Sequence, residues 1–313
     1  MEIVRGLYNL RPDHRGCVAT IGNFDGVHLG HQAVLGQLAE KGAELRLPTV
    51  VVTFEPQPRE FFSPQAPPRL TRFREKIQAL RRFSVDRVVC LRFNQQLAAM
   101  PAQDFIQTLL VNGLDVRYLV VGDDFRFGHQ RHGDFALLQE AGRQHGFEVV
   151  NMHSFSVSNV RVSSTRVREA LAQGDFGAAE QWLGRPYRMS GRVAHGDKRG
   201  RDMGFPTANI HLHRKAAPLQ GVFAVEMYGI RGEPVAGAAN VGTRPTVGGT
   251  RCLLEVHLLD FNADIYGCHV QVEFLHKLRD EIRFATLAEL QQAIAQNCEQ
   301  AREFFRTTAT HNK

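Results

Sequence analysis

The first half of the chain alternates short apolar runs with stretches in which apolar residues recur every three or four positions. This alternation is typical of a parallel sheet with helices packed on its faces. It predicts strands, in chain order, at 16–21, 48–54, 85–93, 116–121 and 147–152. Helical patterns lie between these runs at 30–41, 73–83 and 104–112. Gly42 is placed to end the first helix, and the layout is that of a nucleotide-binding α/β domain.

A Ser-Ser-Thr stretch at 163–165 marks the next helix, because these residues cap helix starts. The apolar stripe that follows it ends at Gly174. A further helix is expected at 177–182. The stretch 183–187, which contains a glycine and a proline, is the candidate domain boundary.

Beyond this boundary the β-type runs are short and are separated by Gly, Pro or Asn turns. They lie at 221–228, 235–241, 252–259 and 269–275. Such a series predicts a small antiparallel barrel, and a helical pattern at 286–306 follows it. The predicted fold class is therefore α/β plus β, with a parallel-sheet domain first and a barrel with a terminal helix second.

The composition fits two ordinary globular domains. A chain of 313 residues exceeds the usual size of one hydrophobic core, and 43% hydrophobic with 22% charged residues excludes disorder. The start lacks the apolar stretch of a signal peptide, and no apolar run is long enough to span a bilayer. We therefore expect a cytoplasmic location. The five cysteines have no zinc or C-x-x-C spacing and are interpreted as buried small hydrophobes.

The charge balance favours anionic ligands, since 38 Lys and Arg residues outnumber 32 Asp and Glu residues. The positive charges are dispersed, and aromatic residues do not alternate with them as on a nucleic-acid stacking surface. We expect small phosphorylated substrates, with no nucleic acid, no membrane and no obligatory protein partner.

The segment 22–31 follows the first predicted strand and ends where the first helix begins. A strand that turns through glycines into a helix directs backbone N–H groups and the positive end of the helix dipole at one point, which favours phosphate. His28 and His31 are three residues apart, so both rings face one side and can donate hydrogen bonds to a phosphoryl group. A metal pair and two surface histidines are the alternatives.

The H-x-G-H element of this segment resembles that of the nucleotidyltransferase superfamily. The longer G-N-F-D-G-V-H stretch resembles the bacterial bifunctional riboflavin kinase/FAD synthetase family. The resemblance implies that the two histidines, together with Asn23, Phe24 and Asp25, hold the phosphates of ATP for adenylyl transfer.

The loop 122–128 resembles the same family and follows the fourth predicted strand, at the sheet edge where ligands bind. The resemblance implies that Asp124 helps to place the nucleotide. A solvated loop with an Asp–Arg pair is the alternative.

The segment 161–168 places hydroxyls, free N–H groups and several cations at a helix start, which makes an anion site. An ordinary capped helix with exposed arginines is the alternative. The match to the family's S-S-T-x-x-R pattern implies that Ser164, Thr165 and Arg168 bind phosphates opposite the two histidines. Arg161 is expected to help them.

The chain departs from the family at one position. Relatives often read T-F-E-P-H-P after the second strand, whereas this chain has Gln57 in place of the histidine. Glutamine cannot take a proton or carry a positive charge, but it can donate a hydrogen bond. We hypothesise that hydrogen bonding is sufficient at this position.

A second polar segment, 195–209, combines glycines, cations, a hydroxyl and an amide without the spacing of a P-loop. A glycine loop that folds over a nucleotide and a solvated basic loop both fit this composition. The segment matches the riboflavin kinase module's G-D-x-x-G-R-x-x-G-F-P-T-A-N. This match implies ATP binding by Gly196, Lys198, Gly200, Gly204, Thr207 and Asn209.

Thr207 and Asn209 are two apart, so in an extended segment their side chains share one side and can offer oxygen donors to Mg²⁺. The resemblance implies the same role. In the run 253–259, alternate residues form an apolar face, which puts Glu255 and His257 on the opposite face. A solvent-facing strand carboxylate is the alternative, but the resemblance implies that Glu255 is the catalytic base.

Two further segments resemble the kinase module. The stretch 240–246 is expected to shape the floor of the active site. The stretch 278–284 resembles the flavin-side loop, and this match implies that Arg279 and Glu281 bind flavin.

The resemblance covers nearly the whole chain and implies two reactions. A Rossmann-like nucleotidyltransferase domain at 1–184 would join FMN to AMP from ATP, which gives FAD and pyrophosphate. A barrel domain at 185–313 would phosphorylate riboflavin to FMN with ATP. Both reactions are expected to need Mg²⁺. The competing hypotheses are a nucleotidyltransferase for another small molecule and a nucleic-acid-binding protein with steeply salt-dependent affinity.

Overall fold

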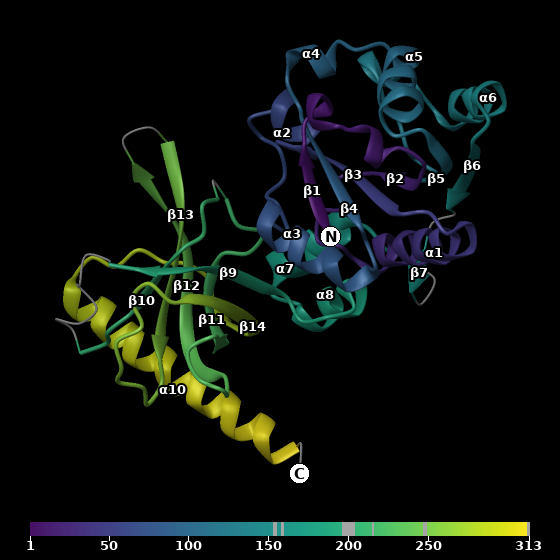
Figure 1. The fold of residues 1–313 in the computed structure, drawn as a ribbon. Coiled ribbons are helices and arrows are strands. Elements are labelled where there is room, and N and C mark those ends of the chain that lie inside the picture. The colour runs from purple at the N-terminus through teal and green to yellow at the C-terminus, as the bar shows by residue number, and fades with distance from the viewer. Residues whose placement is uncertain (153–154, 158–159, 196–203, 215, 247–248, 312–313) are drawn as a thin grey trace. The chain divides into compact units, whose positions relative to one another are not determined.

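The chain forms two compact units in the computed structural model (Figure 1). The structure describes residues 1–311 except 153–154, 158–159, 196–203, 215 and 247–248. The first unit comprises Met1–Pro67 and Thr71–Ser163, and the second comprises Pro68–Leu70 and Ser164–Lys313.

The first unit is built on a six-stranded sheet in the order β1-β4-β3-β2-β5-β6, in which all neighbouring strands are parallel. Its strands are β1 (Glu2–Arg5), β2 (Cys17–Ile21), β3 (Thr49–Glu55), β4 (Arg87–Arg92), β5 (Val116–Gly122) and β6 (Glu148–Met152). The predicted parallel sheet is confirmed. The prediction lacked the edge strand β1, because a four-residue segment with charges at both ends carries almost no apolar pattern.

Helices cover both faces of this sheet, because its strands are apolar on both sides (Figure 1). On one face, the helices at Leu29–Leu45 and Phe73–Leu80 pack on Val18, Val51 and Val120. On the other face, the π-helix at Ile106–Gly113 and the helix at Phe135–His145 pack on Val52 and Leu119. The helices are α1 (Leu29–Leu45), α2 (Pro58–Phe62), α3 (Phe73–Leu80), α4 (Gln95–Ala98), α5 (Ala102–Phe105), the π-helix η4 (Ile106–Gly113) and α6 (Phe135–His145).

The expectation that Gly42 ends the first helix is wrong, because α1 continues to Leu45 and closes at Arg46 in the left-handed region. Gly42 is a buried helical position at which strand β3 approaches closely. A Cβ there would lie 2.7 Å from Thr49 Cγ2 and 3.1 Å from the Leu47 carbonyl oxygen. The absence of a side chain at Gly42 therefore allows α1 to pack closely against the start of β3.

Short elements complete the first unit. Four 3₁₀ turns are described: η1 (Leu7–Asn9), η2 (Pro12–His14), η3 (Arg81–Phe83) and η5 (His129–Arg131). A small antiparallel pair, β7 (Ser156–Val157) and β8 (Val160–Arg161), precedes the second unit in the chain.

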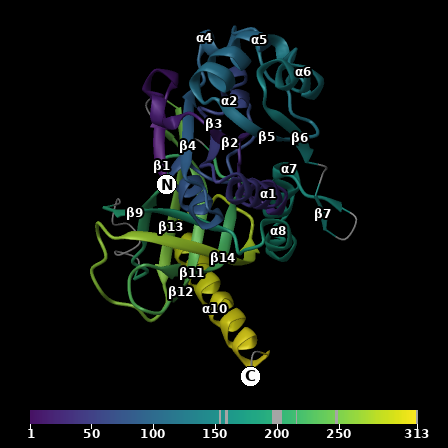
Figure 2. The ribbon, with the colours of Figure 1, turned by 45° about the vertical axis from the view of Figure 1, so that its right-hand side comes forward.

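The second unit is a closed six-stranded barrel in which the neighbouring strands are antiparallel, as predicted (Figure 2). Its strands are β9 (Arg188–Ala194), β10 (Ala208–His211), β11 (Gly221–Tyr228), β12 (Val235–Thr246), β13 (Gly249–Leu258) and β14 (His269–Arg279). The apolar runs did not predict β9 and β10. Alternate residues such as Phe223, Val225 and Val256 fill the core.

Three helices belong to this unit: α7 (Ser164–Gln173), α8 (Phe176–Leu183) and α10 (Leu287–His311). Small residues on the outer face of the barrel, Ala224 and Ala238, allow α10 to pack closely through Cys298 and Ala301. None of the helices in the described residues is long and apolar enough to cross a membrane.

The segment Pro68–Leu70 belongs to the second unit because its carbonyl groups accept hydrogen bonds there. The Arg168 side chain donates to the Pro68 carbonyl at 2.7 Å, and the Tyr187 hydroxyl donates to the Leu70 carbonyl at 3.1 Å. The buried Arg214 donates to the Arg69 carbonyl at 3.0 Å.

Candidate functional site

The turn between β2 and α1 holds His28 and His31 face to face. Their rings are stacked with centroids 3.6 Å apart and an interplanar angle of 17°. His28 is the N-cap of α1, and its Nδ1 accepts a hydrogen bond from the backbone N–H of His31 at 3.3 Å. Since Nδ1 is an acceptor, the proton of a neutral His28 resides on Nε2, where it can be donated to a ligand.

His31 is held in its neutral form. Burial lowers its pKa well below the usual histidine value, and the charges of His28 and Lys76 lower it further. Its Nδ1 is buried and has no hydrogen-bond partner among the residues that the structure describes. The prediction that both rings face one side is confirmed, and at neutral pH the pair offers hydrogen bonds without carrying two positive charges.

The backbone of this turn is strained, because Phe24 and Val27 adopt φ angles of 48° and 45° that non-glycine residues rarely take. The buried Asp25 carboxylate fixes the turn by accepting hydrogen bonds from the Thr71 N–H at 3.0 Å and its hydroxyl at 3.3 Å. The Thr71 hydroxyl in turn accepts from the Gly26 N–H at 3.0 Å. Thr71 was not predicted, because its only signal in the sequence is a hydroxyl just before a helix.

Gln57 lies at the end of the neighbouring strand and is 7% exposed. Its Nε2 and the Asn23 Oδ1 are both buried without a hydrogen-bond partner in the described part of the chain. Strands β2 and β3 are paired, so the residues that follow them meet at the same edge of the sheet. Buried polar atoms of this kind are normally satisfied, so these two are available to a ligand.

The structure brings together two of the predicted nucleotide-placing residues. Arg161 forms ion pairs with Asp123 at 3.1 Å and with Asp124 at 3.2 Å. Arg126, by contrast, pairs with Asp134. Asp124 is 78% exposed, and an exposed ion pair contributes little to stability, so a ligand can replace it at low cost.

The remaining predicted phosphate ligands belong to the second unit. Helix α7 begins at Ser164, as expected, and Thr165 is exposed in its first turn. Arg168 donates to a backbone carbonyl of the same unit. Their position opposite the two histidines stays a prediction.

An aromatic cluster with one exposed member, Phe62, follows Gln57, and the sequence patterns did not predict it. The Phe62 side chain is 67% exposed and packs edge-on against Phe61 and Phe93 at centroid distances of 5.2 and 5.6 Å. Phe93 also packs edge-on against Phe54 in β3. The adjacent Phe-Phe pair was the available signal in the sequence.

In the barrel, the strand register places Glu255 of β13 between two amides. Asn209 of β10 is directly opposite on one side, and Asn240 of β12 is directly opposite on the other. Directly opposed residues on neighbouring strands have Cβ atoms about 5 Å apart. The predicted alternation is confirmed, because Leu254 and Val256 are buried in the core whereas Glu255 is only partly buried.

The loop before β10 is described only at its end. Gly196, Lys198 and Gly200 lie outside the described residues. Gly204 has a φ of 85° and is exposed. Thr207 is partly buried directly before β10, and Asn209 donates weakly to the Thr207 carbonyl at 3.5 Å. With Glu255 beside Asn209, the donor set consists of the hard oxygens that Mg²⁺ prefers, so these residues fit the ion.

A pocket in the same unit joins the two flanking segments of the predicted kinase site. It is lined by Gln220, Thr243, Asp280, Glu281, Ile282 and Arg283. The Glu281 carboxylate lies so close to Gly242 that a side chain at residue 242 would collide with it. Arg279 donates to Asn297 of α10 at 3.0 Å, which fixes the base of this loop.

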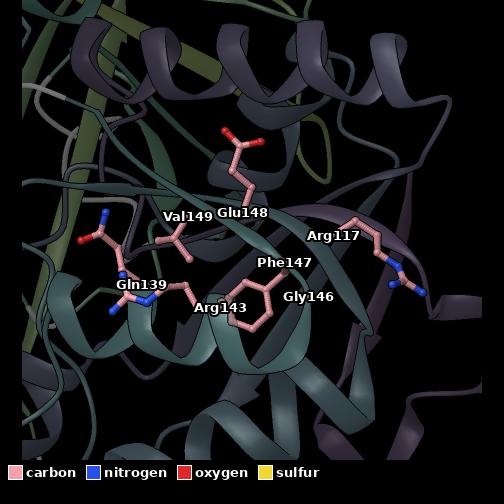
Figure 3. A pocket seen from close by; sticks show the side chains of 8 residues that line it. Arg117, Gln139, Arg143, Gly146, Phe147, Glu148 and Val149 are labelled. Atoms are coloured by element: carbon pink, nitrogen blue, oxygen red, sulfur yellow. The ribbon is translucent and has the colours of Figure 1, made fainter.

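A second pocket lies in the first unit, beside strand β6 and helix α6 (Figure 3). Its lining includes Arg117, Arg143 and Glu148, and none of the predicted site residues. It is therefore no part of either candidate site.

The fold and the polar groups together define a two-unit protein of the nucleotide-binding class. A family model for FAD synthetase matches residues 10–166, and one for riboflavin kinase matches residues 183–305. The bifunctional riboflavin kinase/FMN adenylyltransferase of Escherichia coli (strain K12) is 53% identical over 310 residues, which cover 98% of this chain and 99% of that protein. The protein of the same name from Pseudomonas fluorescens is 54% identical over 94% of each chain. The chain belongs to the bifunctional riboflavin kinase/FMN adenylyltransferase family.

One solved structure resembles nearly the whole chain. It is titled a macrolide-efflux protein from Streptococcus pneumoniae, and it matches with a TM-score of 0.79 and 30% sequence identity. The match covers 96% of this chain and 98% of that one.

Proposed function

We propose that this chain converts riboflavin to FMN in its barrel unit and FMN to FAD in its α/β unit. The observation that carries the proposal is that the two family models match separate stretches of the chain, and each stretch contains a polar site of its own. We assign adenylyl transfer to residues 1–184 and the kinase reaction to 185–313.

In the kinase reaction, Glu255 accepts the proton of the riboflavin 5′-hydroxyl, whose oxygen then attacks the γ-phosphorus of ATP and displaces ADP. Asn209 and Thr207 are the residues that would hold Mg²⁺, and the ion would supply positive charge to offset the negative charge of the ATP phosphates. Asn240 flanks Glu255 on the opposite side and supports its orientation. The loop residues Arg279 and Glu281 contact the flavin.

In adenylyl transfer, a phosphate oxygen of FMN attacks the α-phosphorus of ATP, and pyrophosphate leaves. No covalent intermediate is needed, so the residues act by positioning and by hydrogen bonding to the growing negative charge. His28 donates from Nε2, and its stacking on His31 fixes the ring. Asp124 and Arg161 place the nucleotide.

The aromatic cluster around Phe62 fits the remaining requirement of this site, a surface for the flavin ring. An exposed aromatic side chain can stack on or pack edge-on against a planar ring system. It follows the same strand end as Gln57, at the edge where the phosphate groups are expected.

The proposed reactions use small molecules, namely riboflavin, FMN and ATP. We therefore propose that the chain acts in the cytoplasm, where ATP is available, and that it needs neither nucleic acid nor another protein.

The direct test is to incubate the purified chain with riboflavin, ATP and Mg²⁺ and to follow flavins by chromatography. FMN should form first and FAD after it. Absence of any phosphorylated flavin would refute the proposal and favour a nucleotidyltransferase for another substrate.

A further inference from the structure

Lys76 lies on the buried side of α3 and is 0% exposed. It occupies a core position of an amphipathic helix, next to Ile77 and one turn before Leu80, both of which pack in the core. A fully buried lysine is uncommon, because removing an ammonium group from water is costly. A lysine at a core position that suits an apolar side chain therefore needs a physical explanation.

The Lys76 ammonium reaches the central strand β3. Its Nζ donates to the Thr53 hydroxyl at 3.3 Å, and Thr53 is itself fully buried. The Thr53 hydroxyl lies 3.5 Å from the carbonyl oxygen of Asn23 and donates to it. A chain of two hydrogen bonds therefore connects Lys76 to the strained turn that carries the histidines.

Lys76 also acts on this turn through its charge. It is one of two charged groups that lower the pKa of His31, and the other is the stacked His28. The nearby carboxylate on the turn, Asp25, is engaged with the backbone and hydroxyl of Thr71. A buried positive charge beside the turn also favours the approach of an anion.

We propose that Lys76 is a positioning residue of the adenylyl-transfer site, where it orders the histidine turn through Thr53 and through its charge. The inference rests on the proposed function of this turn. Lys76 makes the turn ready for a polyphosphate: the hydrogen bonds hold the Asn23 carbonyl, and the charge keeps the histidine pair from taking up a second proton.

The test compares Lys76→Met, which removes the charge at similar side-chain length, with Lys41→Met as the matched control. Lys41 lies on α1 of the same unit, where its ammonium pairs with Glu44 at 2.8 Å. Misplacement of a site by a small distance costs about 100-fold in rate, so K76M should lower kcat/KM for FAD formation from FMN by about 10- to 100-fold. Riboflavin phosphorylation by the same chain should not change, and K41M should retain both activities.

Two further readouts separate positioning from a structural role. The His31 imidazole pKa, followed by NMR, should be higher in K76M than in the wild type and unchanged in K41M. Thermal stability should not fall in K76M, because an apolar replacement of a buried charge is often neutral or stabilising. Lys76→Arg keeps the charge and should restore the His31 pKa.

Several outcomes would overturn the inference: wild-type FAD formation by K76M, equal loss of both activities, or an unchanged His31 pKa. If K76M does not fold, Thr53→Val decides, because it breaks the hydrogen-bond chain and keeps the charge. A folded T53V chain that makes FAD at the wild-type rate would contradict the proposal. A wild-type chain that makes no FAD from FMN and ATP would instead contradict the proposed function itself.

Discussion

At the scale of single residues, the protonation state of His31 is the most informative property of the site. Its folded-state pKa is lowered, first by burial and then by the charges of His28 and Lys76. In the unfolded chain the imidazole takes up a proton near pH 6.5. Between these two pKa values the unfolded state binds more protons, so the stability of the fold falls as the pH drops below about 6.5.

We predict that His31→Gln flattens this pH dependence. Over the pH range just below 6.5, one such group contributes a slope of up to about 1.4 kcal/mol per pH unit to the free energy of unfolding. Urea unfolding of the first unit at a series of pH values measures the slope. The exposed His145→Gln is the control and should keep the wild-type slope. An H31Q chain with the wild-type slope would show that His31 is not neutral in the folded protein.

Gln57 provides a second prediction at this scale. Its buried Nε2 is available as a hydrogen-bond donor, so we expect it to serve in place of a histidine. Gln57→His should leave FAD formation close to the wild-type rate. Gln57→Met removes one neutral hydrogen bond of about 1 kcal/mol and should lower kcat/KM by about fivefold. Steady-state kinetics with FMN and ATP measure both, and a much faster Q57H enzyme would show that charge matters at this position.

At the scale of elements, α1 shows how tertiary contacts override local signals. A glycine near a helix end usually stops the helix, but Gly42 lies inside α1 because β3 approaches it closely. Gly36 lies on the exposed side of the same helix, and no atom lies within 4 Å of a Cβ built there. Replacement by alanine should therefore change the free energy of unfolding in opposite directions at the two glycines.

Gly36→Ala should raise the free energy of unfolding of the first unit by up to about 1 kcal/mol, because alanine favours helix. Gly42→Ala should lower it by about 1–3 kcal/mol, because the new methyl group overlaps Thr49 Cγ2. Urea unfolding at pH 7.5 compares the two variants directly. If G42A were stabilising, the close approach of β3 would not be the reason for this glycine.

The strands of both units were largely predictable, because apolar runs in a parallel sheet and alternation in a barrel are local patterns. The residues that pair with β13 could not be predicted from such local patterns. Alternation showed that Glu255 faces away from the core, but only the register shows that Asn209 and Asn240 flank it. Register depends on how distant segments meet, so Asn240 was not predicted as a neighbour of Glu255.

At the scale of the whole molecule, sequence motifs predicted the histidine pair, Asp124 and Glu255 as site residues, because each follows a strand or lies on the side of a strand that faces away from the core. They did not identify Thr71, which lies just before α3, or Lys76, which lies within α3, a helix with the pattern of an ordinary core element. Buried residues that contact a turn only through tertiary hydrogen bonds have no characteristic pattern in the sequence around them. Their role becomes visible only when burial and hydrogen-bond partners are known.

We expect residues 1–184 and residues 185–313 to carry one reaction each. Each reaction has its own polar groups, so one change should remove one activity and leave the other. Glu255→Gln should lower FMN formation by about 10²- to 10⁴-fold, the usual contribution of a general base, and should still make FAD from added FMN. The double variant His28→Ala/His31→Ala should show the reverse pattern.

The decisive measurement is chromatography of flavins formed from riboflavin or from FMN, with ATP and Mg²⁺, by these two variants of the full chain. We expect that E255Q makes FAD only when FMN is supplied, and that H28A/H31A accumulates FMN without FAD. Loss of both activities from either folded variant would contradict two independent sites.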